Sequence, residues 1–164
     1  MPLFYGPFFA YHHTMDDLKK KAESGDVAAQ NEMAASFLTQ EPPNLEEAVK
    51  WLRLAADQGD AGAQNNLGVL YMQGDGVKEG HKEAAKLFRR AADQGIPSAQ
   101  ANIGSCYAQG AGVPQSWEEA YFWWKLGFEE GEGAEFLEEA LENLTPEQKD
   151  SVEARVKDWK PQAK

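Results

Sequence analysis

The residues best suited to catalysis or metal binding in this sequence are three histidines and one cysteine, and their spacing predicts neither kind of site. His12 and His13 are adjacent, so on regular structure their side chains point in different directions. His81 has no His or Cys three or four residues further on, whereas a metal site needs ligands that converge. Cys106 has no histidine near it in the sequence, and we expect a buried, unreactive thiol. These spacings predict neither a bound metal ion nor a cysteine nucleophile.

Two glycine-rich segments have the composition of a phosphate-binding loop but not its context. Gly74-Asp75-Gly76 and Gly110-Ala111-Gly112 follow no predicted strand, and no Lys-Ser or Lys-Thr pair comes after them. Carboxylates are numerous, but an acid–base pair needs two of them in one pocket, and the sequence gives no sign of such a pocket. Asn143-Leu144-Thr145 fits an N-glycosylation pattern, which the role of Thr145 as a helix cap explains equally well. We therefore expect no cofactor and no catalytic residue, and we interpret the glycine clusters as turns.

The sequence repeats itself with a period of about 36 residues. An Ala-Gln pair recurs at equivalent positions, residues 29–30, 63–64 and 99–100. An Ala-Ala-Asp-Gln-Gly run occurs at residues 55–59 and 91–95. Self-similarity at such a period is the signature of a repeat array. Apolar residues at helical spacing lie on both sides of each glycine turn. Each unit is therefore predicted to be a helix, a turn and a second helix.

A single helical hairpin cannot bury its own apolar face, but a stack of hairpins can, which makes a solenoid. Gly68 and Gly104 stand at equivalent positions and have no Cβ, so we expect a neighbouring helix to pack closely against each. Gly59, Gly95 and Gly131 fit the position after a helix at which the backbone turns left-handed. The predicted fold class is an all-α solenoid.

The second and third units resemble the Sel-1-like repeat, a relative of the tetratricopeptide repeat. The shared motif is Ala-xxx-Leu/Ile-Gly-xx-Tyr-xx-Gly-x-Gly-Val, which begins at Ala63 and again at Ala99, with Ala84 and Ala120 in the second helices. The first unit is degenerate and has a shorter turn. The resemblance covers about residues 15–132. It implies a right-handed superhelix of helix pairs and a scaffold for protein interactions, without implying any reaction.

On this basis the chain divides into an aromatic segment, a repeat array and a cap. The predicted parts are residues 1–13, a repeat array over 14–132 (a partial repeat 14–25 and repeats 26–60, 61–96 and 97–132), and capping helices over 133–164. A short helix is expected to begin at Thr14, and the last helix at Thr145-Pro146. Three interpretations of residues 1–13 remain open: a non-native extension with Met15 as the natural start, a strap over the open end of the array, or a peptide that docks in a groove.

Charge and composition restrict the class of partner. The net charge of -11 disfavours nucleic acid, because phosphate binding relies on Lys and Arg. The mean hydropathy of -0.62 and the lack of a long apolar run disfavour a membrane protein. We expect a protein or peptide partner, with a basic one favoured, and a monomer, because like charges oppose self-association. The single cysteine suits a reducing compartment, so we expect a cytoplasmic protein, or a periplasmic or secreted one if a leader was removed.

The first candidate surface follows from the resemblance, which implies that the first helix of each pair lines a concave face. The predicted groove residues are Asn31, Glu32, Asn65, Asn66, Val69, Met72, Gln73, Asn102, Ser105 and Gln109. Amide side chains both donate and accept hydrogen bonds, so they suit an extended peptide backbone. Related tetratricopeptide domains sometimes clamp a peptide carboxylate with Lys and Asn at this face, but this chain has no Lys or Arg at the corresponding positions. The alternative is that these polar side chains are simply solvated.

Two further surfaces are candidates. Phe122 replaces Lys50 and Lys86 of the earlier units, so it is either an exposed anchor for a partner or covered by the terminal helices. Glutamates cluster between residues 118 and 142 against a single base, Lys125. They form either a solvated face or an acidic surface that attracts a basic protein.

These patterns predict a non-catalytic binding module, either an adaptor or a small immunity or antagonist protein that occludes a basic partner. The alternative is a hydrolase, because cysteine-rich relatives of this family have been described as hydrolysing β-lactams. A third alternative is a repeat protein built or altered in the laboratory. The near-identical Ala-Ala-Asp-Gln-Gly runs would permit that origin, but the degenerate first unit argues against it.

Overall fold

Short apolar-striped segments separated by glycine or proline turns fold into a row of paired helices. The computed structural model describes the backbone of residues 7–129 and 132–162, with side chains from Met15 onward within those ranges. The helices are α1 (Pro7–Glu23), α2 (Val27–Leu38), α3 (Leu45–Asp57), α4 (Ala61–Gln73), α5 (His81–Asp93), α6 (Pro97–Gln109), α7 (Trp117–Gly127), α8 (Ala134–Glu142) and α9 (Pro146–Asp158). No strand occurs in these described residues.

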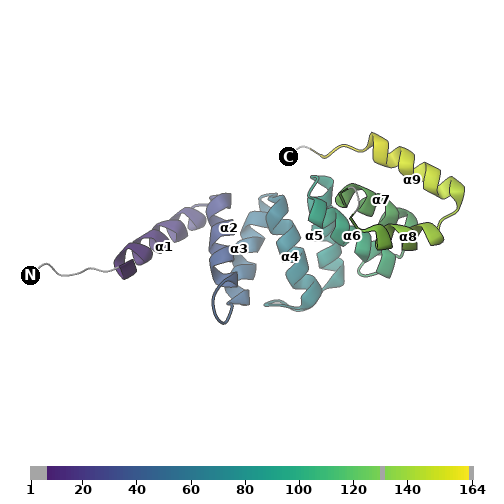
Figure 1. Cartoon of the computed structure of the whole chain (residues 1–164). Coiled ribbons are helices and arrows are strands. Elements are labelled where there is room, and N and C mark those ends of the chain that lie inside the picture. Colours follow the sequence, from purple (N-terminus) through teal and green to yellow (C-terminus); the bar gives the residue numbers. More distant parts are fainter. Residues whose placement is uncertain (1–6, 130–131, 163–164) are drawn as a thin grey trace, which may run out of the picture.

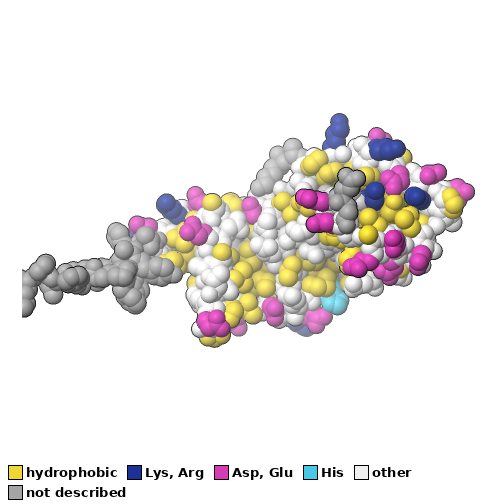
Figure 2. All heavy atoms as spheres, in the orientation of Figure 1, with side chains coloured by type: hydrophobic (Ala, Val, Ile, Leu, Met, Phe, Trp, Pro, Cys, Tyr) yellow, Lys and Arg dark blue, Asp and Glu magenta, His cyan; other side chains and the backbone are white. Residues whose placement is uncertain are grey.

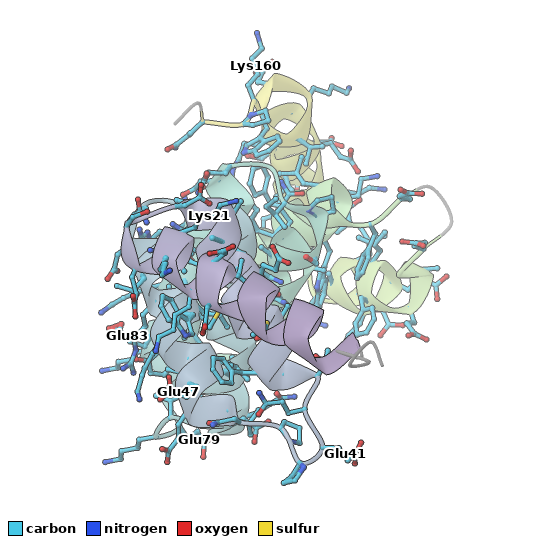
Figure 3. All side chains as sticks on the ribbon, turned by 90° about the vertical axis from the view of Figure 1, so that its left-hand side faces the viewer. Lys21, Glu41, Glu47, Glu79, Glu83 and Lys160 are labelled. Atoms are coloured by element: carbon cyan, nitrogen blue, oxygen red, sulfur yellow. The ribbon has the colours of Figure 1, made fainter. Side chains whose placement is uncertain are left out.

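The helices pair as the repeat period predicts. The hairpins α2–α3, α4–α5 and α6–α7 lie side by side, and the second helix of one hairpin packs on the first helix of the next (Figure 1). Seen from the N-terminal end, Glu47 of α3 and Glu83 of α5 lie on the same side of the row (Figure 3). The second helices therefore share one face. Helices α8 and α9 both pack on α7. The predicted all-α solenoid is confirmed.

The N-terminal helix starts earlier than the sequence predicted. Helix α1 begins at Pro7, not at Thr14, and packs on α2. Proline is well tolerated in the first turn of a helix because its fixed φ is already helical. No glycine or proline then interrupts the chain before Gly25. The three interpretations of residues 1–13 concern side chains that lie outside the described residues.

Side-chain caps and left-handed glycines fix the ends of the repeat helices. Asp26 and Asp60 precede α2 and α4, and each carboxylate accepts a hydrogen bond at 2.7 Å from the backbone N–H three residues further on. Gly59 and Gly95 follow α3 and α5 with φ of 91° and 88°, the predicted left-handed conformation. Gly131, predicted to do the same, lies outside the described residues.

Close helix packing occurs at the two small residues where it was predicted. An ideal Cβ built on Gly68 would lie 2.7 Å from Cε1 of Phe88, and one built on Gly104 would lie 2.6 Å from Cδ1 of Trp124. Atoms of real Cβ groups do not approach this closely. In both hairpins an aromatic ring of the second helix therefore rests directly on the backbone of the first.

A ladder of buried glutamines connects the repeats and gives the Ala-Gln motif its physical reason. Gln64 is 1% exposed, and its Nε2 donates to the carbonyl of Ala56 in the preceding repeat at 3.2 Å. Its Oε1 accepts a hydrogen bond at 3.0 Å from Nε2 of Gln94, just after the second helix of its own repeat. Equivalent bonds join Gln30 to Ala22 and Gln58, and Gln100 to Ala92. Each glutamine thus uses a helix-end carbonyl, where backbone acceptors outnumber donors.

The C-terminal tail runs back along the array after α9. The backbone N–H of Gln162 donates to the carbonyl of Asp93 at 2.8 Å. Pro161 packs against Gly95 in the turn between α5 and α6. The tail therefore joins the end of the chain to the second repeat as well as to the third.

Candidate partner-binding surfaces

A pocket between α4 and α6 contains most of the predicted groove residues. It has a volume of about 220 Å³ and is lined by Val69, Met72, Gln73, Phe88, Asn102, Ser105, Cys106, Gln109 and Ala111. We call this the groove pocket. Six of its nine lining residues come from the predicted set, contributed by first helices of consecutive repeats. The helical spacing of those positions is what brings them onto one face.

Asn65 does not face solvent as predicted. It is only 9% exposed, because the side chain of Asn102 from the next repeat covers it. Nδ2 of Asn102 donates to Oδ1 of Asn65 at 3.0 Å. Asn65 therefore holds Asn102 in place at the rim of the groove pocket, and the prediction that Asn65 projects freely into the groove is wrong.

The remaining predicted groove residues lie away from this pocket. Asn66 is exposed on α4 but is not part of the pocket lining. Asn31 is half-buried on α2, and Glu32 borders a separate depression at the junction of α1 and α2, beside Asp17 and Lys21. The predicted surface is thus divided, with its pocket between the second and third repeats.

Phe122 is not an exposed anchor. It is 5% exposed, and the guanidinium of Arg155 from α9 lies over its ring at 4.4 Å from the centroid. Its neighbour Tyr121 donates a hydrogen bond to Glu153 of α9 at 2.6 Å. Burial and this carboxylate both raise the pKa of Tyr121 above its ordinary value. The aromatic residues of α7 therefore form the platform on which the cap packs.

Acidic side chains gather over the α7–α8 end of the array (Figure 2). Glu119 is engaged by Arg155 at 2.7 Å, and Glu153 lies 3.9 Å from Lys125. The exposed glutamates of α8, in contrast, have no ion-pair partner among the described residues: Glu135, Glu138, Glu139 and Glu142. We call these four the acidic face.

A second depression, of about 430 Å³, was missed by the sequence reasoning. Its floor is mainly apolar and its rim is cationic, and it is lined by Ala85, Ile103, Tyr107, Gly112 and Val113, with Lys82, Lys86, Arg89 and Arg90 of α5. We call these four cations the basic stripe. The sequence signal for it is the spacing of four, seven and eight residues from Lys82, which places all four cations on one helix face.

The candidate chemical groups are placed in structural roles. Cys106 is buried, as predicted, and burial raises the pKa of its thiol to about 11. Nε2 of His81 contacts Oε1 of Glu79 at 2.8 Å, on the surface. Gly74 and Gly110 end α4 and α6 in the left-handed conformation, which confirms the interpretation of both glycine clusters as turns. Among the described residues, no three His, Cys, Asp or Glu side chains converge as metal ligands would.

No helix in the described part of the chain is long and apolar enough to cross a bilayer.

Comparisons with known proteins agree with this architecture. The Sel1 repeat matches three times, at residues 27–60, 61–96 and 97–132. No curated protein matches the chain. The crystal structure of a protective antigen present in uropathogenic Escherichia coli strains, which displays an SLR fold, is 31% identical with a TM-score of 0.75. That alignment covers 88% of this chain and 32% of the antigen, so the chain spans about a third of its length.

A Sel1 repeat protein from Oxalobacter formigenes is 32% identical with a TM-score of 0.62, over 89% of this chain and 98% of that protein. The three repeat matches together cover well over half of the chain. Their boundaries coincide with the hairpins α2–α3, α4–α5 and α6–α7. The chain therefore belongs to the Sel1 repeat family.

Proposed function

We propose that this chain is a non-catalytic module that binds an extended segment of a partner protein across α4 and α6. The observation that carries the proposal is the groove pocket, which has no charged lining residue in a chain where 26% of residues are charged. Displacing water from an unpaired charged group costs far more free energy than displacing it from an apolar or hydrogen-bonded polar one, so an uncharged lining favours an inserted apolar group. Protein–protein interaction is also the general role of Sel1 repeats.

The size of the groove pocket favours one side chain of a partner over a small-molecule substrate. Its volume of about 220 Å³ lies below the range of roughly 300–1,000 Å³ that is typical of small-molecule sites. Met72, Val69 and Phe88 supply apolar surface within it. The amides of Gln73 and Gln109 at its edge can pair with the backbone of the segment that carries the inserted side chain.

The acidic face adds a second element to the proposal, because it favours a basic partner. Its four glutamates lie on one short helix, and the chain as a whole carries a charge of -11. Such a field speeds the encounter with a basic protein, and salt screens it. Both an adaptor and an antagonist of a basic protein would use this chemistry. Association that slows as salt rises, with little change in dissociation, is the expected kinetic result.

The experiment is a selection of displayed random peptides on the purified protein, followed by fluorescence anisotropy with the selected peptides. We expect peptides with one conserved apolar residue. Ser105→Arg should weaken their binding at least about tenfold, because it places a long cationic side chain in the uncharged groove pocket. Ser151→Arg, the same change on the exposed surface of α9, is the matched control and should leave binding unchanged. Equal affinity for all three proteins would refute the proposal.

The hydrolase alternative has a separate test. The buried thiol of Cys106, with its pKa raised to about 11, is protonated at neutral pH and is a poor nucleophile. We therefore expect no turnover of a chromogenic β-lactam. Turnover that tracks the protein through purification and is lost on one side-chain substitution would replace the binding proposal with an enzymatic one.

A further inference from the structure

The basic stripe and the depression beside it form a second, chemically different surface. The groove pocket and this depression lie on opposite sides of α6: Asn102 and Ser105 face the former, and Ile103 and Tyr107 face the latter. The two share no lining residue. One surface has no charge, whereas the other combines an apolar floor with four cations on α5. A single ligand class does not suit both.

The basic stripe is specific to the second repeat. At the equivalent positions the first repeat carries Glu46, Lys50, Arg53 and Leu54, and the third carries Glu118, Phe122, Lys125 and Leu126. The formal charge of these four positions is therefore +4 in α5 but +1 in α3 and zero in α7. Ordinary repeat architecture does not need this cluster, because α3 and α7 form the same fold without it.

The cations are only partly neutralised by neighbouring carboxylates. Lys86 pairs with Glu83 at 3.1 Å and Arg89 with Asp93 at 3.0 Å, and both pairs are surface-exposed. Lys82 and Arg90 have no carboxylate within 4.0 Å among the described residues. Nη2 of Arg90 instead donates to the carbonyl of Ala56 in the preceding repeat at 3.1 Å, which leaves Lys82 as the cation without a partner in the described part of the chain. Arg89 is also held over the ring of Trp123, 5.0 Å from its centroid, which fixes its guanidinium beside the depression. A local excess of positive charge therefore faces an apolar floor.

From this geometry we propose that the basic stripe binds an acidic peptide segment of a partner protein, with an aromatic or large aliphatic side chain that enters the depression. Its volume of about 430 Å³ accommodates such a side chain, which Ile103, Tyr107 and Val113 would contact. Carboxylates on either side of it would pair with Lys82 and Lys86. The argument depends on charge complementarity and is independent of the groove pocket.

The overall charge of the protein distinguishes this occupant from large polyanions. Nucleic acid or an anionic membrane would meet the field of the whole chain, whose net charge is -11. A short peptide meets mainly the charges within a Debye length, about 10 Å at moderate salt. The local positive excess therefore favours a small acidic segment over an extended anionic surface.

The test is a fluorescence-anisotropy titration of the full chain with a labelled octapeptide that has one tryptophan among glutamates. Saturable binding is expected, and Lys82→Glu and Lys86→Glu should each weaken it about tenfold, as expected for reversing a charge beside the ligand. Lys50→Glu is the matched control, because Lys50 occupies the position of Lys86 one repeat earlier and pairs with Glu47 as Lys86 does with Glu83. It should change the affinity less than about twofold.

Peptide variants test the apolar part of the proposal. Replacing the tryptophan by alanine should weaken binding about tenfold or more, which corresponds to the loss of an inserted aromatic side chain. A peptide with lysines in place of the glutamates should not bind this surface. Circular dichroism of each protein variant checks that the helices are intact.

Four results would overturn the proposal. The first is no saturable binding below about 1 mM peptide. The second is an equal loss of affinity in Lys50→Glu and Lys86→Glu. The third is concentration-dependent self-association that Lys86→Glu abolishes, which would make a second copy of this chain the occupant. The fourth is binding to vesicles rich in phosphatidylserine that is tighter than binding to the peptide.

Discussion

The contact between Gly104 and Trp124 gives the most direct test of how the hairpins pack. Trp124 is 1% exposed, and its Nε1 donates to the carbonyl of Ala101 at 3.2 Å. In the variant Gly104→Ala, the new methyl group would lie 2.6 Å from Cδ1 and 2.7 Å from Nε1 of this ring. Carbon atoms in contact are normally about 3.5–4.0 Å apart, so the ring must move by roughly 1 Å. The buried ring has little room for that movement.

The expected loss of stability follows from three contributions. Overpacking of a filled core costs about 1–3 kcal/mol. Movement of the ring weakens the hydrogen bond from Trp124 to Ala101, which contributes about 1 kcal/mol. Alanine favours a helix over glycine by about 1 kcal/mol, which acts in the opposite direction. We therefore expect Gly104→Ala to lower the free energy of unfolding by about 1–3 kcal/mol.

The assay is urea denaturation followed by circular dichroism at about 222 nm, compared with Gly62→Ala as the control. Gly62 is an exposed helical residue, and the nearest atom to its added Cβ is Oδ1 of Asp60 at 3.4 Å. Without a clash, only the gain in helix propensity remains, so this variant should be more stable than the parent by up to about 1 kcal/mol. If Gly104→Ala were also as stable as the parent, the packing argument would be wrong.

Three other measurements test the structure. A double-mutant cycle of Gln64→Ala and Gln94→Ala should give a coupling free energy of about 0.5–1.5 kcal/mol, whereas additive losses would contradict the glutamine ladder. Cys106, with its pKa raised from 9.0 to about 11, should react with a disulfide reagent at pH 8 about a hundredfold more slowly than a free thiol. Rapid labelling of the native protein would refute the buried placement of this thiol. Because the folded state retains the thiol proton more tightly than the unfolded state, the free energy of unfolding should also fall as pH rises above about 9. Phe122→Ala should lower the free energy of unfolding by about 3–5 kcal/mol without lowering the affinity for peptides that bind in the groove pocket. A variant of unchanged stability with lower peptide affinity would instead support Phe122 as an exposed anchor.

The repeat architecture was predictable because the same residue types recur at equivalent positions of successive repeats. The 36-residue spacing of Gly68 and Gly104 assigned both to the same close contact, and the structure places an aromatic ring on each. Most of the groove pocket was also predictable, since Val69, Met72 and Ser105 follow from helical spacing within a repeat of known orientation. Periodicity is sufficient wherever a residue's surroundings are those of its own hairpin.

Sequence reasoning failed where the surroundings came from another element. Burial of Asn65 depends on the reach of Asn102 from the next repeat, which no periodicity within one helix reveals. Burial of Phe122 depends on how α9 packs on α7. The sequence left two alternatives for Phe122, an exposed anchor or a residue covered by the terminal helices. The start of α1 was misplaced because Thr14 was interpreted as the capping residue, although Pro7 is compatible with a first turn and begins the helix.

The basic stripe was missed for a different reason. Its four cations are regularly spaced in the sequence, but the net charge of -11 favoured a basic partner, so the predicted charged surface was the glutamate cluster of residues 118–142. Lys82 and Arg90 replace Glu46 and Leu54 of the preceding repeat. The signal lies in all four equivalent positions taken together, whereas the interpretation of Phe122 used the position of Lys86 alone.

Because the C-terminal tail returns to α5, the two ends of the array are held by different numbers of contacts. At the first end, α1 packs mainly on α2, so fraying there breaks one helix contact. At the other end, the third repeat is held by α5 on one side and by α8 and α9 on the other, while Gln162 ties the tail to Asp93. We therefore expect local opening to begin at the first end of the described array. A segment seated between α4 and α6 would contact the second and third repeats, away from that end, so we expect opening at α1 to leave its site intact.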